Sequence, residues 1–257
     1  MILILKHYIA RMLKDPMNYI MLIIFPVILI SVTTLSVNVE GTDFLRYGFD
    51  PFATGQTSFN ALFFQFFCGM IVADILYLEF RSDMRWRLMA TPKPFSSFVR
   101  AGIAASIIVS IINGVVVFSF GRFVLNAHLH NLFISSVTLL TLAMFVTFIG
   151  VLCFMLIPKK SITTALIMVF AFAQLLPVQF NMINIDIGSI GLASFIPVVA
   201  ANNAMMYSGI MMLEIIDGNI IWHDTDMRMS LIHLGILASY MLAAGIAIVI
   251  LGRKRPI

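Results

Sequence analysis

Residues with chemically active side chains are few in this sequence, and their spacing excludes several common kinds of site. The chain has no G-x-x-x-x-G-K-[ST] phosphate loop, no H-E-x-x-H zinc motif and no G-x-S-x-G nucleophile motif. His128 and His130 lie close together, but no further metal ligand stands near them. Cys68 and Cys153 fall in apolar runs and are interpreted as packing residues. We therefore expect neither a catalytic site nor a metal or cofactor in this chain.

One acidic residue and one mainly acidic segment remain as candidates for chemistry. Asp74 is the only ionisable residue well inside an apolar run, and it stands five residues before Glu79, or about 7–8 Å from the end of that run. An acid at this depth reaches the membrane interface or pairs with Arg81 or Arg85. The second candidate is a polar segment that we interpret as solvated surface. It contains Asp217, His223, Asp224 and Asp226.

A basic segment with interleaved apolar and aromatic residues is the most distinctive polar stretch. It covers residues 79–100 and reads EFRSDMRWRLMATPKPFSSFVR. On a helix, Phe80, Met84 and Leu88 share one face, and Pro92 ends the helix. The pattern fits a loop that anchors membrane topology, or a short helix presented to a soluble partner.

The composition decides the class of protein. Of the 257 residues, 61% are hydrophobic and 11% are charged, whereas a soluble domain has about 45–50% apolar and about 25% charged residues. So few charges cannot cover the surface of a soluble domain. The sequence predicts a polytopic membrane protein, and the net charge of +4 is attributed to basic inner loops rather than to nucleic-acid binding.

The apolar runs predict an all-α fold with six transmembrane helices in a single transmembrane domain, residues 1–257. The predicted spans are 19–37, 59–78, 101–120, 132–157, 162–180 and 229–251. Residues 1–15 form an amphipathic helix that lies in the interface, and Pro16 separates it from the first span. A further apolar stretch, 187–213, is interrupted by Pro197 and by the pair Asn202–Asn203.

The distribution of charge predicts the orientation. With six spans and both termini in the cytoplasm, all basic residues except Arg46, Arg122 and Arg228 lie on the inner side. A seventh crossing through 187–213 would place the basic tail 253–255 outside. We therefore expect that stretch to be re-entrant or to lie at the outer surface.

Two strings resemble the membrane-spanning subunits of ABC-2-type ABC transporters. RMLKDPMNYIMLIIFPVILI, residues 11–30, is similar to that family's entry into the first span, where an interfacial helix ends at an R/K-D-P turn. Residues 79–92 follow E-x-R-x-D-M-R-W-R-L-M-A-T-P and resemble the family loop E-R-x-x-G-T-x-x-x-L-L-A-T-P. The sequence departs from the family pattern at Asp83-Met84, where Gly-Thr is common. The predicted layout is similar over nearly the whole chain.

The resemblance implies a permease in the cell membrane that works with other subunits. Residues 79–92 would form the coupling helix, which docks in a separate nucleotide-binding subunit that holds ATP and Mg²⁺. Residues 189–212 would be the outer re-entrant helices, with Pro197, Asn202 and Asn203 at the outer gate. A second permease, identical or paralogous, would complete the transporter. The residues implied to contact the ATPase subunit are Glu79, Arg81, Asp83, Met84, Arg85, Trp86, Arg87 and Leu88, with Lys6 and Arg11 of the interfacial helix.

The resemblance also implies a cargo pathway along spans one, two and five. The polar candidates are Thr33, Thr34, Ser36, Asn60, Gln65 and Gln174. The aromatic candidates are Phe59, Phe63, Phe64, Phe66 and Phe67, most of which we expect to pack in the core or to face lipid. The polysaccharide-exporter pattern R-Y-x-x-S-x-L-G-x-x-W is absent before the first span. We therefore expect a hydrophobic or amphipathic cargo such as a drug, an antimicrobial peptide or a lipid-like molecule.

Two other classes of function are weighed against this one. An ion-coupled secondary carrier would need ionisable groups at the membrane midplane and internal repeats, and the sequence has neither. A membrane-embedded enzyme acting on lipid would depend on the acidic group around Asp224. Neither alternative explains the two family-like strings.

Overall fold

The computed structural model describes residues 2–36, 51–82, 95–127, 131–181, 192–209, 212–216, 219–223 and 225–254. These residues form helices and one two-stranded antiparallel hairpin. The elements are α1 (Ile2–Lys14), α2 (Pro16–Tyr19), the π-helix η1 (Ile20–Ile24), α3 (Phe25–Ser36), α4 (Pro51–Phe80), α6 (Phe95–Phe123), α7 (Leu132–Leu156), α8 (Lys160–Asn181), the 3₁₀-helix η3 (Leu192–Phe195), α9 (Pro197–Gly209), β1 (Met212–Ile216), β2 (Asn219–His223) and α10 (Met227–Lys254).

Among the described residues, four helices are long and apolar enough to cross a membrane. They are Ala53–Phe80, Ser96–Phe123, Leu132–Leu156 and Met227–Arg253. Two shorter apolar helices, Ile20–Thr34 and Lys160–Gln174, accompany them. The prediction of a helical fold with apolar helices of membrane-spanning length is confirmed, and the hairpin β1–β2 was not expected from the sequence.

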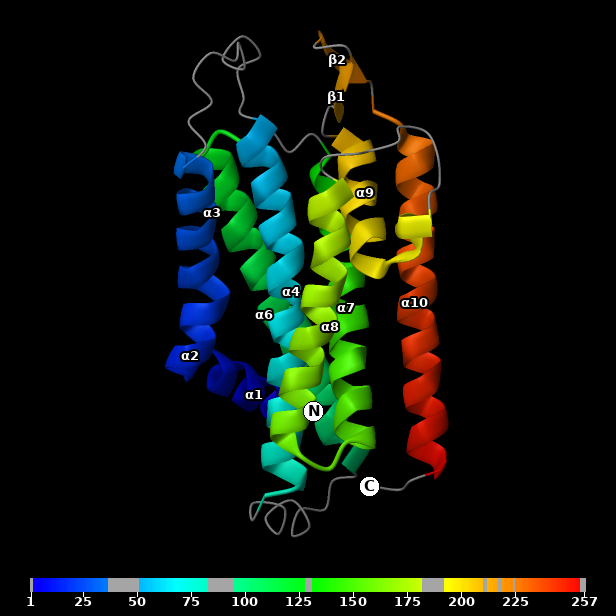
Figure 1. Ribbon diagram of the computed structural model, residues 1–257. Coiled ribbons are helices and arrows are strands. Elements are labelled where there is room, and N and C mark those ends of the chain that lie inside the picture. The colour runs from blue at the N-terminus through cyan, green and yellow to red at the C-terminus, as the bar shows by residue number, and fades with distance from the viewer. Residues whose placement is uncertain are drawn as a thin grey trace.

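The long helices run side by side, with α4 at the centre of the bundle (Figure 1). α4 packs against α3, α6, α7 and α8, while α10 packs against α7 and α9. α1 lies across the lower end of the bundle in Figure 1 and contacts α6. As predicted, α1 ends before Pro16, because proline cannot continue a helix from within.

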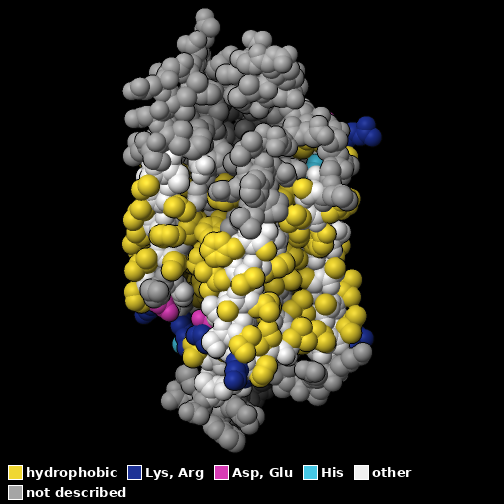
Figure 2. Space-filling model, in the orientation of Figure 1, with side chains coloured by type: hydrophobic (Ala, Val, Ile, Leu, Met, Phe, Trp, Pro, Cys, Tyr) yellow, Lys and Arg dark blue, Asp and Glu magenta, His cyan; other side chains and the backbone are white. Residues whose placement is uncertain are grey.

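Basic side chains gather at one end of the bundle, the lower end in Figures 1 and 2, which we call the basic end. Hydrophobic side chains cover the middle of the face shown in Figure 2. Arg122 and Arg228 lie at the opposite end. The basic residues of the basic end whose side chains are described are Lys6, Arg11, Lys14, Arg81, Arg100, Lys159, Lys160 and Arg253.

Two glycines allow α4 and α7 to approach each other closely. A Cβ atom on Gly150 would overlap the carbonyl oxygen of Gly69, and one on Gly69 would lie 2.7 Å from the side chain of Val146. Small residues are favoured where membrane helices pack, because close backbone approach increases van der Waals contact. The central helix pair therefore depends on glycine at both positions.

A proline in the first apolar helix leaves a backbone carbonyl that another helix satisfies. In an α-helix the Leu22 carbonyl accepts from the N–H of residue 26, but Pro26 has none. The helix widens to a π-helix over Ile20–Ile24, and the buried Asn113 of α6 donates its amide hydrogen to the Leu22 carbonyl. Asn113 thus joins α6 to the first apolar helix.

We expect Gly150→Ala and Gly69→Ala to destabilise the protein, each by about 1–3 kcal/mol, because the added methyl overpacks the α4–α7 contact. The measurement is the apparent melting temperature in mild detergent. Gly235→Ala is the matched control, since no heavy atom of the described residues lies within 4 Å of the Cβ position there. If the variants at 69 and 150 have the same apparent melting temperature as the wild type, the α4–α7 contact is not tightly packed.

We also expect Asn113→Leu to destabilise the protein by about 1–3 kcal/mol, because the Leu22 carbonyl loses its buried donor. The loss should be smaller in a Pro26→Ala background, where residue 26 supplies a backbone N–H. Melting temperatures of the two single variants and the double variant measure this coupling. Additive effects would contradict the link between Pro26 and Asn113.

Candidate functional site

The last turn of α4 and the two residues after it form the candidate functional site. We call Tyr77–Ser82 the α4 end. It lies at the basic end of the bundle, between α1 on one side and the junction of α7 and α8 on the other. The segment resembling a coupling helix, 79–92, begins here, and its residues 83–92 lie outside the described residues.

An ion pair joins the α4 end to α1. Arg11 Nη1 lies 2.9 Å from Glu79 Oε1, and Glu79 is 7% exposed. Tyr8 and Met12 are buried on the same side of α1 and pack with residues of α4 and α6. Burial raises the pKa of the Tyr8 hydroxyl, the Glu79 carboxylate raises it further, and Arg11 opposes the shift. α1 is thus fixed to the bundle by an apolar face and one charged contact.

A second set of contacts joins the α4 end to the junction of α7 and α8. The Arg81 guanidinium donates to the carbonyl of Phe154 at 2.8 Å and also to that of Ile157. The Tyr77 hydroxyl donates to the Ile157 carbonyl and lies 2.8 Å from Thr163 Oγ1. The guanidinium carbon is 5.0 Å from the centre of the Tyr77 ring and 4.9 Å from that of Phe154.

These contacts close the C-terminus of α7. The last carbonyls of a helix have no partner within it and carry partial negative charge, so a guanidinium is a favourable cap. Pro158 follows the C-cap residue Ile157 and cannot extend the helix. Two side chains two residues apart, Glu79 and Arg81, therefore tie the α4 end to different neighbours.

The implied contacts with an ATPase subunit divide into two sets. The structure places Glu79, Arg81 and Arg11 in contacts within the chain, while Lys6 is exposed. The remaining implied residues lie outside the described residues. They are Asp83, Met84, Arg85, Trp86, Arg87 and Leu88.

Asp74 has an ion-pair partner that the sequence did not suggest, and Arg85, one of the expected partners, lies outside the described residues. The Asp74 carboxylate pairs with Lys160, with Oδ2 and Nζ 3.0 Å apart, rather than with Arg81. The reason is that Arg81 is engaged with the carbonyls of α7, while α8 begins at Lys160 and packs beside α4.

The aromatic pathway candidates of α4 lie together. Phe63 and Phe67 share a face of the helix, with ring centres 5.8 Å apart, and Phe63 lies 6.0 Å from Phe172 of α8. Phe64 and Phe66 are buried, as expected for core packing, and Phe59 and Phe63 are partly buried.

The polar pathway candidates are not brought to one place. Thr33 and Asn60 donate to carbonyls of their own helices, Leu29 at 2.8 Å and Gln56 at 2.8 Å. Gln65 is buried and accepts from Ser110 of α6. Gln174 of α8 accepts from the N–H of Val198 at 3.3 Å and so caps α9. The buried hydroxyl of Thr34 has no hydrogen-bond partner within the described part of the chain, and the side chain of Ser36 is not described.

The implied outer gate is fastened to α10. Pro197 begins α9, Asn202 is buried, and Asn203 Nδ2 lies 3.4 Å from Nε2 of the buried His233. The His233 Nδ1 lies 2.8 Å from the Met229 carbonyl, which only accepts, so Nδ1 carries the proton and Nε2 accepts from Asn203.

Two further side chains of α10 complete this attachment. Ser230 donates to the Ala204 carbonyl and Tyr240 to the Phe195 carbonyl, each at 2.7 Å. The sequence analysis missed Ser230, His233 and Tyr240. Their spacing, i, i+3 and i+10, puts them on one face of a helix, and this polar face within an apolar run is the signal that could have found them.

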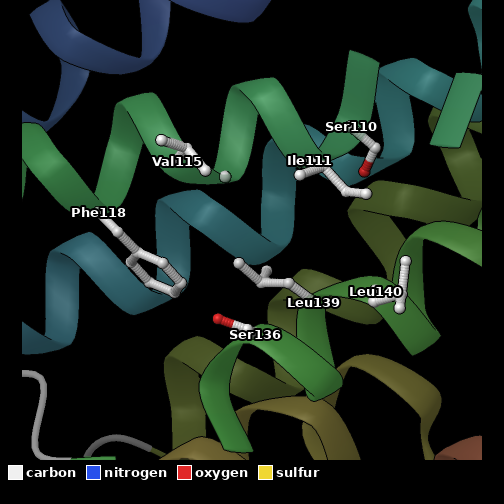
Figure 3. A pocket seen from close by; sticks show the side chains of 8 residues that line it. Ser110, Ile111, Val115, Phe118, Ser136, Leu139 and Leu140 are labelled. Carbon is white, nitrogen blue, oxygen red and sulfur yellow. The ribbon is translucent and has the colours of Figure 1, made fainter. Parts of the chain in front are cut away.

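A cleft of about 70 Å³ between α6 and α7 is separate from the α4 end (Figure 3). Figure 3 shows Leu139 reaching toward Phe118 across the space between the two helices. The lining holds the hydroxyls of Ser110 and Ser136 but no ionisable side chain. Among the described residues, no group of three or more His, Cys, Asp or Glu is placed to hold a metal ion.

We expect Glu79→Ala to loosen α1 and to destabilise the protein by about 1–2 kcal/mol, because Arg11 keeps a partly desolvated charge without its partner. Hydrogen exchange of the α1 amides should rise, and the charge swap Arg11→Glu with Glu79→Arg should recover part of the loss. Lys6→Ala is the control on the exposed face of α1. If hydrogen exchange of the α1 amides rises as much in the charge swap as in Glu79→Ala, the ion pair does not hold α1 in place.

No family model, no curated protein and no solved structure matches this chain. A conclusion about function therefore rests on the sequence pattern and on the geometry of the α4 end.

Proposed function

We propose that this chain is the membrane-spanning subunit of an ATP-driven exporter of the ABC-2 type. The observation that carries the proposal is the position of the α4 end. The string resembling a coupling helix starts at Glu79, and Glu79 and Arg81 attach that start to α1 and to the α7–α8 junction. A rigid segment with such attachments can pass a displacement to several helices.

In the proposed mechanism, a separate ATPase subunit drives the permease through the coupling helix. When ATP closes the partner subunits, the coupling helix moves and takes the α4 end with it. Glu79 carries the movement to α1, and Arg81 and Tyr77 carry it to α7 and α8. The bundle then changes between inward-open and outward-open packings, whose balance ATP shifts. Hydrolysis takes place in the partner, which holds ATP and Mg²⁺.

The proposal includes a layout in the cell membrane. The concentration of described basic residues at one end supports placing that end, with both termini, in the cytoplasm. Six spans follow if the two shorter apolar helices also cross. α9 lies beside one half of α10 in Figure 1, and α8 ends and α10 begins at the same end of the bundle, opposite the basic end. This arrangement supports a re-entrant outer segment between α8 and α10.

The cargo and the second permease belong to the same proposal. A second copy or a paralogue would face α3, α4 and α8, so that the pathway is enclosed between two subunits. The faces of α3 and α8 carry exposed apolar side chains, among them Ile28, Val32 and Phe172, which supports a hydrophobic or amphipathic cargo.

We expect the double variant Arg85→Glu, Arg87→Glu to lower cargo-linked ATPase activity by about tenfold, because basic anchors at an interface contribute much of its binding energy. Membrane insertion should not change. The chain is purified in mild detergent from its own host, and the co-purified ATPase is identified and assayed. Arg253→Glu with Lys254→Glu, at the same end on α10, is the matched control.

Unchanged ATPase activity in the assembled 85/87 variant would remove the coupling-helix assignment. A chain that purifies without any ATPase would remove the transporter proposal itself.

A further inference from the structure

A partly exposed stripe runs along α4 from the aromatic pathway candidates to Asp74. Phe63, Phe67, Met70 and Asp74 follow one another at spacings of four, three and four residues, so they lie on one face of the helix. Phe67 is buried, Phe63 and Met70 are half-buried, and the side chain of Asp74 is 39% exposed. The stripe thus has an apolar, aromatic part and one carboxylate.

α8 provides the second wall of this stripe. Phe172 is exposed and its ring centre lies 6.0 Å from that of Phe63, and Met168 packs against the same cluster as Phe63 and Met70. Methionine side chains are flexible and polarisable, so such a wall adapts to apolar groups of different shape.

The counter-ion of Asp74 is weakly held. Lys160 Nζ lies 3.0 Å from Oδ2, and the Lys160 side chain is 49% exposed. Asp74 Oδ1 is buried and has no hydrogen-bond partner among the described residues. Lys160 is the first residue of α8, where the helix dipole disfavours a cation. Holding its long side chain in one conformation also costs entropy. Another cation can therefore replace this ammonium group at little loss.

The depth of Asp74 fits a particular kind of cation. Asp74 stands six residues before the end of α4, or about 9 Å along the helix. An amphipathic molecule places its charged group near the boundary of headgroups and acyl chains, with its apolar part deeper. The stripe offers the same order, with the carboxylate near the basic end and the phenylalanines farther in.

We propose that Asp74 binds the charged group of an amphipathic organic cation, whose apolar part lies along Phe63, Met70, Met168 and Phe172. Lys160 is the internal competitor that the ligand displaces. Export of this ligand rests on the proposed function above, whereas its binding requires no ATPase subunit.

The test measures binding to the purified chain in nanodiscs of zwitterionic lipid. The probe is a fluorescent dye that carries a trimethylammonium group on an alkyl chain, and an uncharged dye of the same chain length is the control probe. Empty nanodiscs correct for partition into lipid. The variants are Asp74→Asn, Asp74→Glu and Lys160→Met, and Asp226→Asn, at the opposite end of the bundle, is the control variant.

We expect Asp74→Asn to weaken binding of the cationic dye by about tenfold and Lys160→Met to tighten it by about threefold, since one removes the counter-charge and the other the competitor. Asp74→Glu should retain most of the affinity. The uncharged dye should bind all variants alike, and Asp226→Asn should bind as the wild type.

If Asp74→Asn and Lys160→Met change the affinity for the cationic dye in the same direction, the pair only joins α4 to α8 and the proposal is overturned. An unchanged affinity in Asp74→Asn would also overturn it. If Asp74→Asn does not assemble, Lys160→Met decides, and a loss or no change of affinity overturns it. Dye binding without a co-purifying ATPase would remove the proposed function alone. If an ATPase co-purifies but the dye binds the Asp74 variants as tightly as the wild type, only this inference is removed.

Discussion

Inside a membrane, the backbone polar groups must find their partners within the protein, because the hydrocarbon offers none. The contacts between the helices of this chain follow that constraint. Asn113 reaches the Leu22 carbonyl next to Pro26, and Ser230 and Tyr240 reach carbonyls of the α9 segment. Arg81 does the same for the end of α7. These polar side chains stand on otherwise apolar helices. They thereby determine which helices pack together and how the helices are offset along their axes.

Close backbone packing supplies the second part of the architecture. Lipid competes with apolar side chains for the same contacts, so helix association depends on shape and on close approach. Gly69 and Gly150 bring α4 and α7 together, and α4 then serves as the helix against which α3, α6 and α8 are placed. α4 is consequently in contact with most of the other long helices.

The basic end combines two arrangements with different chemical character. At the α4 end, Glu79 and Arg81 make well-defined contacts that join three parts of the chain, which suits transmission of movement. One and a half turns earlier, Asp74 shares a half-exposed ion pair with a lysine on a flexible stem, which suits exchange of partners. Burial separates the two, since the Glu79 side chain is 10% exposed and that of Asp74 is 39% exposed.

The sequence by itself determined the class of protein and the positions of its apolar helices. Long apolar runs must be helical in a membrane because only a helix satisfies its own backbone, so composition and run length suffice. The break at Pro16 followed from the sequence as well. The sequence placed Asp74 near the end of its helix but did not suggest Lys160 as its partner, because position along a helix is a property of one helix and pairing is not.

Only the tertiary structure decided the contacts between helices. That Arg81 closes α7, that Lys160 reaches Asp74 and that His233 meets Asn203 depend on how helices far apart in the sequence are rotated and offset. Hydrophobic periodicity carries little of that information here, because these helices are apolar on nearly every side and the pattern no longer identifies an inward face.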